Sequence, residues 1–160
     1  HNSWLAPSYQ DKIALINDAR FRKSRYNKIM LTILFSYADW GVLLLRVIFG
    51  LIFLVHGWPK LKNLKGTQAW FDSMGFKPGV FWGTLVALLE VVGGLLLVAG
   101  LFTQIVAILF AMQMFVITIW KMRLGQKLAG GYELDLILLG VAVAFALNGG
   151  GAITLDGFYF

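Results

Sequence analysis

The amino-acid sequence predicts an all-α integral membrane protein, a four-helix bundle preceded by an N-terminal interfacial helix. Hydrophobic residues make up 59% of the 160 residues and the mean hydropathy is +0.74, which is too apolar for a water-soluble domain. A membrane-spanning helix needs about 20 residues, so the chain after Asp39 accommodates four spans with short loops. We therefore divide the chain into an N-terminal arm, residues 1–38, and a four-span membrane domain, residues 39–160.

The arm is polar up to residue 28 and contains six basic residues. These residues do not show the pattern of a signal peptide, in which a charged segment is followed by an apolar one. The stretch from Ile29 to Trp40 is apolar except near Asp39, and we interpret it as an interfacial helix that leads into the first span. It could instead begin one long tilted helix.

The first span is expected to end before Trp58 and Pro59, because proline lacks a backbone donor and tryptophan prefers the headgroup level. Lysines and aromatic residues then alternate in a loop that suits the membrane surface. A turn at residues 100–103 is so short that spans two and three must form an antiparallel hairpin. The four spans are expected at about 41–57, 80–101, 104–122 and 132–147.

Small residues at helical spacing predict the faces on which the spans meet. Close packing alone accounts for these glycines and alanines. The expected inward faces are Gly83, Ala87, Glu90 or Val91 and Gly94 in span two, Ala107, Ala111, Met114 and Thr118 in span three, and Glu133, Ile137, Gly140 and Ala144 in span four.

The basic residues gather at the ends of the apolar runs, which indicates contact with anionic lipid headgroups rather than nucleic acid. Six Lys and Arg residues precede the first span, four lie in loop one, none in loop two and three in loop three. The densest group borders the first span, so we expect a cytoplasmic N-terminus in a prokaryotic-type inner or plasma membrane. The absence of cysteine excludes disulfides, thiolate metal sites and iron–sulfur ligation by this chain.

Three polar residues, Arg46, Glu90 and Gln113, fall inside the spans, where an unpaired charge costs a few kcal/mol. Counting 1.5 Å per residue from the loops places Arg46 and Glu90 within about 8 Å in depth, so we expect them to pair, with Gln113 nearby. The pair could fix the register of the helices. Alternatively, it could provide a proton-accepting carboxylate or a polar contact for a ligand.

A second polar group, the predicted rim, is expected where span one ends and span four begins. His56 and Trp58 would there meet Tyr132, Glu133 and Asp135. A histidine beside carboxylates and aromatic walls suits a quinone headgroup or a proton relay. The alternative is that these side chains only cap helices and complement their dipoles.

Other cofactor motifs are missing from the sequence. One usable histidine cannot supply two axial ligands to haem, and no phosphate-binding loop or nucleophile motif occurs. We therefore expect no metal site, no covalently bound cofactor and no catalysis by this chain alone. A non-covalently bound quinone is the cofactor that the predicted rim could take.

Several stretches resemble the DoxX family of four-span membrane proteins. They are LLRVIFGLIFLVHGWPKL at 44–61, EVVGG at 90–94, GLFT at 100–103 and GGYEL at 130–134, and they occur in the expected order within residues 40–160. The resemblance places Arg46, Glu90 and Glu133 at the intramembrane charged positions of the family.

The resemblance also implies an association with oxidoreductase systems. The family includes the membrane subunit of a thiosulfate:quinone oxidoreductase and members proposed to hold redox or detoxifying enzymes at the membrane. The arm is longer and more polar than the usual lead-in, which leaves room for a partner-binding role. Without cysteine or cofactor ligands, the chain is not expected to be an independent thiosulfate oxidase.

The expected function is thus that of a small membrane subunit of a quinone-linked redox complex, which docks a protein partner and offers a polar pocket near the membrane rim. A structural anchor or assembly subunit without a ligand is the alternative. A small-solute transporter is less favoured, because no broken helix is evident.

Overall fold

The computed structural model describes residues 18, 20–22, 25–26, 30, 32 and 37–159, with side chains up to residue 157. The chain divides after Ala38 into two compact units. In the first unit, Arg22 forms an ion pair with Asp18, four residues earlier. Half of the predicted interfacial helix at 29–40, residues 29, 31 and 33–36, lies outside the described residues.

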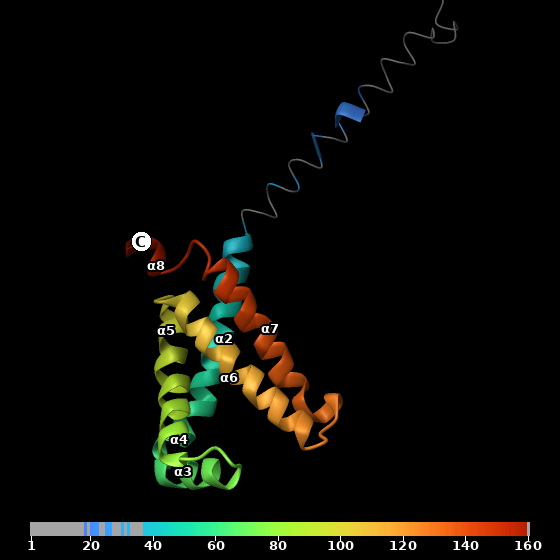
Figure 1. Ribbon diagram of the computed structural model, residues 1–160. Helices are drawn as coiled ribbons and strands as arrows, with labels where there is room; N and C mark the ends of the chain where they lie inside the picture. The colour runs from blue at the N-terminus through green and yellow to red at the C-terminus, as the bar shows by residue number, and fades with distance from the viewer. Residues whose placement is uncertain are drawn as a thin grey trace, which may run out of the picture. The chain divides into compact units, whose positions relative to one another are not determined.

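Every regular element among the described residues is helical, and four helical segments are long and apolar enough to cross a membrane (Figure 1). The predicted all-α, four-span fold is therefore confirmed. The first span is α2 (Ala38–Lys62), and the second is continuous through α4 (Gly79–Leu88), π-helical η1 (Leu89–Gly93) and α5 (Gly94–Ala99). The third is α6 (Thr103–Arg123). The last is α7 (Glu133–Asn148), which follows the segment η2 (Leu128–Tyr132), where the backbone is non-helical at Ala129 and Gly130. Two short helices, α3 (Leu64–Ser73) and α8 (Asp156–Tyr159), complete the membrane domain.

Helix α2 is longer than predicted, because it continues through Pro59 to Lys62 instead of ending at Gly57. Proline removes one helical donor, but the backbone N–H of Asn63 still donates to the Pro59 carbonyl at 3.0 Å, so the last turn forms. The extension places Lys60 on the helix. Helical side chains lean toward the helix N-terminus, which at this end of α2 means back into the bundle.

Helix α3 forms within the predicted surface loop and packs against the start of α4. The Asn63 side chain caps it by accepting from the backbone N–H of Gly66 at 3.2 Å. Its buried residues are Thr67 and Phe71. The carboxylate of Asp72 accepts from the backbone N–H of Gly79 at 2.7 Å, which satisfies one of the donors at the beginning of α4.

The core of the bundle lies between α2, α5, α6 and α7 and is rich in phenylalanine. The rings of Phe53 and Phe110 are stacked with centroids 3.6 Å apart, and Phe49 meets both rings edge-on. Helices α2 and α5 touch at glycines, because a Cβ on Gly50 would lie 2.7 Å from the Gly94 carbonyl oxygen. This contact sets how closely span two approaches span one.

The predicted inward faces are confirmed for spans two and three, where the named residues are buried except for the half-buried Ala111. The face predicted for span four is wrong. Ile137 is 62% exposed, and Gly140 and Ala144 are exposed as well. The residues that α7 buries instead are Asp135, Leu138, Ala142 and Phe145, of which only Ala142 is small. Side-chain size therefore misled the prediction.

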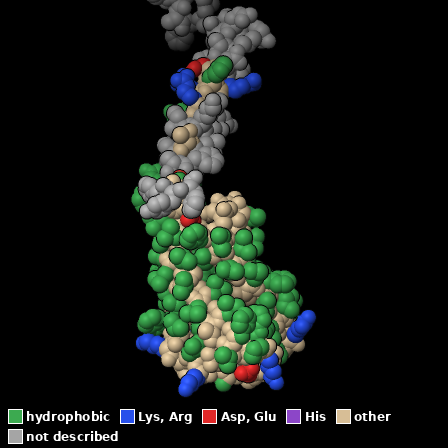
Figure 2. All heavy atoms as spheres, turned by 60° about the vertical axis from the view of Figure 1, so that its left-hand side comes forward, with side chains coloured by type: hydrophobic (Ala, Val, Ile, Leu, Met, Phe, Trp, Pro, Cys, Tyr) green, Lys and Arg blue, Asp and Glu red, His purple; other side chains and the backbone are tan. Residues whose placement is uncertain are grey.

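Apolar side chains cover the flank of the bundle, as expected for a surface in contact with lipid (Figure 2). Lys and Arg side chains gather at the end that carries α3 and the α6–α7 loop. Exposed tryptophans mark both ends of α2, Trp40 and Trp58, and their 18-residue separation corresponds to about 27 Å of helix. This length matches the hydrocarbon core of a bilayer, about 30 Å.

Candidate functional site

A cavity of about 490 Å³ lies at the α3 end of the bundle. The pair α6–α7 slants away from α4 toward this end (Figure 1), and side chains of α3, α4, η1 and α6 line the space between them. Its wall is apolar except at Lys60 and Gln113, and five of the lining residues are aromatic. The other lining residues are Trp70, Phe71, Met74, Phe76, Trp82, Leu85, Val86, Leu89, Leu109, Met112, Val116, Ile117 and Trp120.

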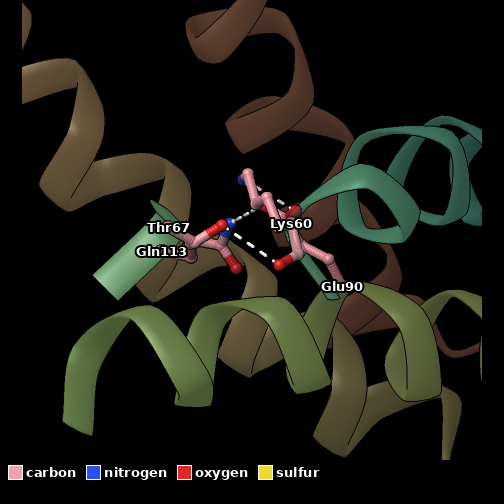
Figure 3. A network of polar contacts seen from close by, with 4 residues as sticks. All are labelled: Lys60, Thr67, Glu90 and Gln113. Atoms are coloured by element: carbon pink, nitrogen blue, oxygen red, sulfur yellow. Dashed lines mark hydrogen bonds and ion pairs between the residues drawn. The ribbon is translucent and has the colours of Figure 1, made fainter. Parts of the chain in front are cut away.

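The polar end of the cavity is a three-residue network centred on Glu90 (Figure 3). The ammonium of Lys60 donates to both carboxylate oxygens of Glu90, at 2.6 and 2.7 Å. The amide Nε2 of Gln113 donates to Oε1 of Glu90 at 2.5 Å. The Glu90 side chain is only 3% exposed, so these donors replace the water that a carboxylate otherwise requires.

Local backbone features place each member of this network. Glu90 lies in η1, and π-helical turns inside α-helices are frequent at functional sites. Gly57 lets α2 approach η1, because a Cβ there would lie 2.6 Å from Cβ of Glu90. Lys60 follows one turn later on the same face, and the hydroxyl of Thr67 donates to its backbone carbonyl at 3.1 Å (Figure 3).

The predicted ion pair between Arg46 and Glu90 is wrong. Arg46 is 2% exposed, and its guanidinium donates to the backbone carbonyls of Gly150 and Ile153, each at 3.0 Å. It contacts Gly100, whereas Glu90 is level with Gly57. The 11 residues between Arg46 and Gly57 correspond to about 16 Å of helix, so the two charges lie at different depths. The prediction failed because it assigned Lys60 to a loop.

Arg46 instead holds the C-terminal segment over the opposite end of the bundle. The Asp156 carboxylate accepts from the backbone N–H groups of Phe102 and Thr103, at 2.7 and 2.9 Å, and so caps α6. Burial alone would raise the pKa of Asp156. The two backbone hydrogen bonds and the nearby charge of Arg46 outweigh burial and hold that pKa below its ordinary value.

The structure divides the residues of the predicted rim among separate surroundings. His56 is exposed, Trp58 is 51% exposed with Lys62 over its ring, and Glu133 is exposed. Asp135 is buried and accepts from the Lys121 ammonium at 2.5 Å.

Within residues 37–159, no hydrogen bond or ion pair links His56 to Tyr132, Glu133 or Asp135. The described residues also contain no group of three or more His, Asp or Glu side chains able to hold a metal ion. A ligand at this rim stays a prediction.

Comparison with known proteins identifies the family. The DoxX family model matches residues 41–122. A protein of Bacillus subtilis (strain 168) named "Putative oxidoreductase CatD" is 39% identical over 120 residues, covering 75% of this chain and 87% of the relative. The inner membrane protein YqjF of Escherichia coli (strain K12) is 32% identical over 123 residues, covering 74% of this chain and 91% of the relative.

A second Escherichia coli (strain K12) protein, the inner membrane protein YphA, is 27% identical over 134 residues and covers 75% of this chain and 95% of its own length. No solved structure matches the chain. The matched region includes Lys60, Glu90 and Gln113, so the whole polar network lies inside it. With its four spans and these relatives, the chain is a multi-pass membrane protein that belongs to the DoxX family.

Proposed function

We propose that this protein is the small membrane subunit of a quinone-linked oxidoreductase system and that the cavity at the α3 end holds the quinone. The observation that carries the proposal is the cavity itself, an apolar space of about 490 Å³ with five aromatic residues in its wall and one polar end. Its volume lies within the range of about 300–1,000 Å³ that is usual for small-molecule sites. A quinone combines an apolar ring with carbonyl acceptors, and the Lys60 ammonium is a donor at the end of an apolar space.

The proposal places the quinone headgroup at Lys60 rather than at His56. Lys60 and Gln113 line the cavity, whereas His56 does not. Aromatic side chains from three helices provide flat surfaces against which a ring can stack. A span-embedded carboxylate such as Glu90 is a functional-site candidate by default, because burying it has a cost in free energy.

A protein partner completes the proposed function. The name of the Bacillus subtilis relative supports a redox context for the family. The arm contains six basic residues next to the first span and is the segment that we propose docks the partner. Deleting residues 1–28 should release the partner from the purified protein while the four spans remain folded. Retention of every native partner by the truncated protein would remove the docking role from the arm.

The binding test compares two lysine variants of the full-length protein in detergent. Lys60→Met removes the donor at the cavity, and Lys121→Met removes the equivalent partner of a second carboxylate, Asp135, which does not line the cavity. Titration with 2-methyl-1,4-naphthoquinone should show about five- to tenfold weaker binding for Lys60→Met only. Equal effects of the two substitutions, or no binding by the wild type, would favour a structural anchor without a ligand.

The membrane orientation is also a proposal, with the N-terminus on the cytoplasmic side. Four spans return the C-terminus to the same side as the N-terminus. Because the chain has no cysteine, single cysteines report topology cleanly. A membrane-impermeant thiol reagent added outside intact cells should label Gln126→Cys, in the α6–α7 loop, but not Ala152→Cys, and the opposite result would reverse the orientation.

A further inference from the structure

We infer that the cavity binds the reduced, hydroxyl-bearing form of its aromatic ligand, a hydroquinone, in preference to the quinone. This inference rests on the proposed function, because it concerns the ligand of the same cavity. It follows from the donors and acceptors that remain unused at the polar end, next to Glu90.

The unused acceptor is Oε1 of Gln113, which is buried and has no hydrogen-bond partner among the described residues. Glu90 fixes the orientation of this amide, because only the NH₂ group can face a carboxylate at 2.5 Å. The carbonyl oxygen must therefore point away from Glu90. A buried acceptor without a donor is costly, and such atoms in folded proteins call for a missing partner.

The unused donor is on Lys60. An ammonium has three N–H groups, and two of them satisfy the two oxygens of Glu90 at 2.6 and 2.7 Å. Lys60 and Gln113 both line the cavity. Under this inference its polar end has one donor, the third N–H of Lys60, and one acceptor, the enclosed Oε1 of Gln113, which must turn toward a ligand to be used. A quinone carbonyl can only accept, so it would use Lys60 and leave Gln113 unsatisfied. A phenolic hydroxyl can accept from Lys60 and donate to Gln113.

The preference has a redox consequence. A ligand couple whose reduced form binds tenfold more tightly has its two-electron midpoint potential raised by about 30 mV. The bound couple would then be a better electron acceptor than the same couple free in the bilayer.

The test uses the full-length wild-type protein and three ligands with one ring system. Anaerobic calorimetry in detergent would compare 2-methyl-1,4-naphthoquinone, its hydroquinone and the dimethyl ether of that hydroquinone, which has oxygen acceptors but no donor. We expect the hydroquinone to bind about tenfold more tightly than either of the others. Equal binding of quinone and hydroquinone, or tighter binding of the quinone, would overturn the inference and leave the proposed function standing. No binding by any of the three would overturn both.

A variant ties the preference to the amide. Gln113→Met keeps the length of the side chain but has no amide oxygen, so the hydroquinone should lose its advantage over the quinone. Lys121→Met, at the ion pair outside the cavity, should retain the wild-type ratio. If Gln113→Met does not fold, the three-ligand series on the wild type still decides the question.

Discussion

The Lys60 ammonium lies 2.6 and 2.7 Å from the two Glu90 carboxylate oxygens, although 30 positions separate the residues in sequence. A lysine in the last turn of a spanning helix ordinarily extends to the headgroups. Here the side chain turns into the bundle, toward a carboxylate that is almost fully buried. The pair therefore joins α2 to η1 and holds a charged group against the cavity in a fixed position.

A double-mutant cycle should show that Lys60 and Glu90 are coupled. Lys60→Met or Glu90→Gln alone should lower the free energy of unfolding by roughly 3–5 kcal/mol, because each leaves a buried polar group without its partner, and the double variant should lose far less than the sum. Unfolding in mixed detergent micelles gives the four values. The cycle of Arg46→Gln with Glu90→Gln is the control, and it should be additive within about 0.5 kcal/mol. Additive losses for Lys60 and Glu90 would contradict the pairing.

Replacing Gly57 by a larger residue should destabilise the protein. An added Cβ would lie 2.6 Å from Cβ of Glu90, so Gly57→Ala must push α2 away from η1. We expect a loss of roughly 1–3 kcal/mol in unfolding free energy and weaker quinone binding, since Lys60 moves with α2. Gly140→Ala is the matched control, because nothing lies within 4 Å of a Cβ at that position of α7. A neutral Gly57→Ala variant would show that the approach of α2 to η1 is not tight.

The spans could be predicted because length and hydropathy decide them, and the turn at residues 100–103 fixed the α5–α6 hairpin. Glu90 and Gln113 could also be found, since a polar side chain within an apolar run is visible in sequence, and the structure brings them together. Lys60 was missed because Pro59 normally ends a helix. Nothing in the sequence indicates that α2 continues or that a π-helical turn carries Glu90.

The failure at α7 has a different cause. Glycine and alanine mark tight contacts between helices, but a helix that packs mainly through larger side chains, as α7 does with Ala142 as the exception, gives little such signal. The buried face of α7 carries Asp135, whose partner Lys121 lies on α6. The buried face of α7 therefore carries one member of an ion pair with the neighbouring helix α6. Sequence alone did not show which of several charged residues at the rim would pair.

Arg46 should hold the C-terminal segment independently of the cavity. Arg46→Gln cannot reach both the Gly150 and Ile153 carbonyls in the geometry of the guanidinium, so residues 150–157 should become sensitive to protease. The proposed quinone binding at Lys60 should stay within about twofold of wild type. Peptide mapping after limited proteolysis gives the first result and calorimetry the second. Loss of quinone binding with an intact C-terminal segment would contradict the separation of the two polar sites.

The hydrogen bonds that join Asp156 of the C-terminal segment to the start of α6 should weaken in acid. The folded pKa of Asp156 lies below its ordinary value, so the carboxylate stabilises the fold fully above its unfolded pKa, about 3.9. The contribution is lost as the pH falls from there through the lowered folded pKa. Hydrogen exchange of the Phe102 and Thr103 amides, corrected for intrinsic rates, should therefore increase below about pH 4. In Asp156→Asn the protection should be low at every pH, because the amide cannot replace a carboxylate that accepts two backbone hydrogen bonds.

Asp72→Asn is the control, because it alters the cap of α4 at the opposite end of the bundle. This variant should keep the wild-type pH profile at residues 102 and 103. An unchanged pH profile in Asp156→Asn would assign the acid sensitivity to another group.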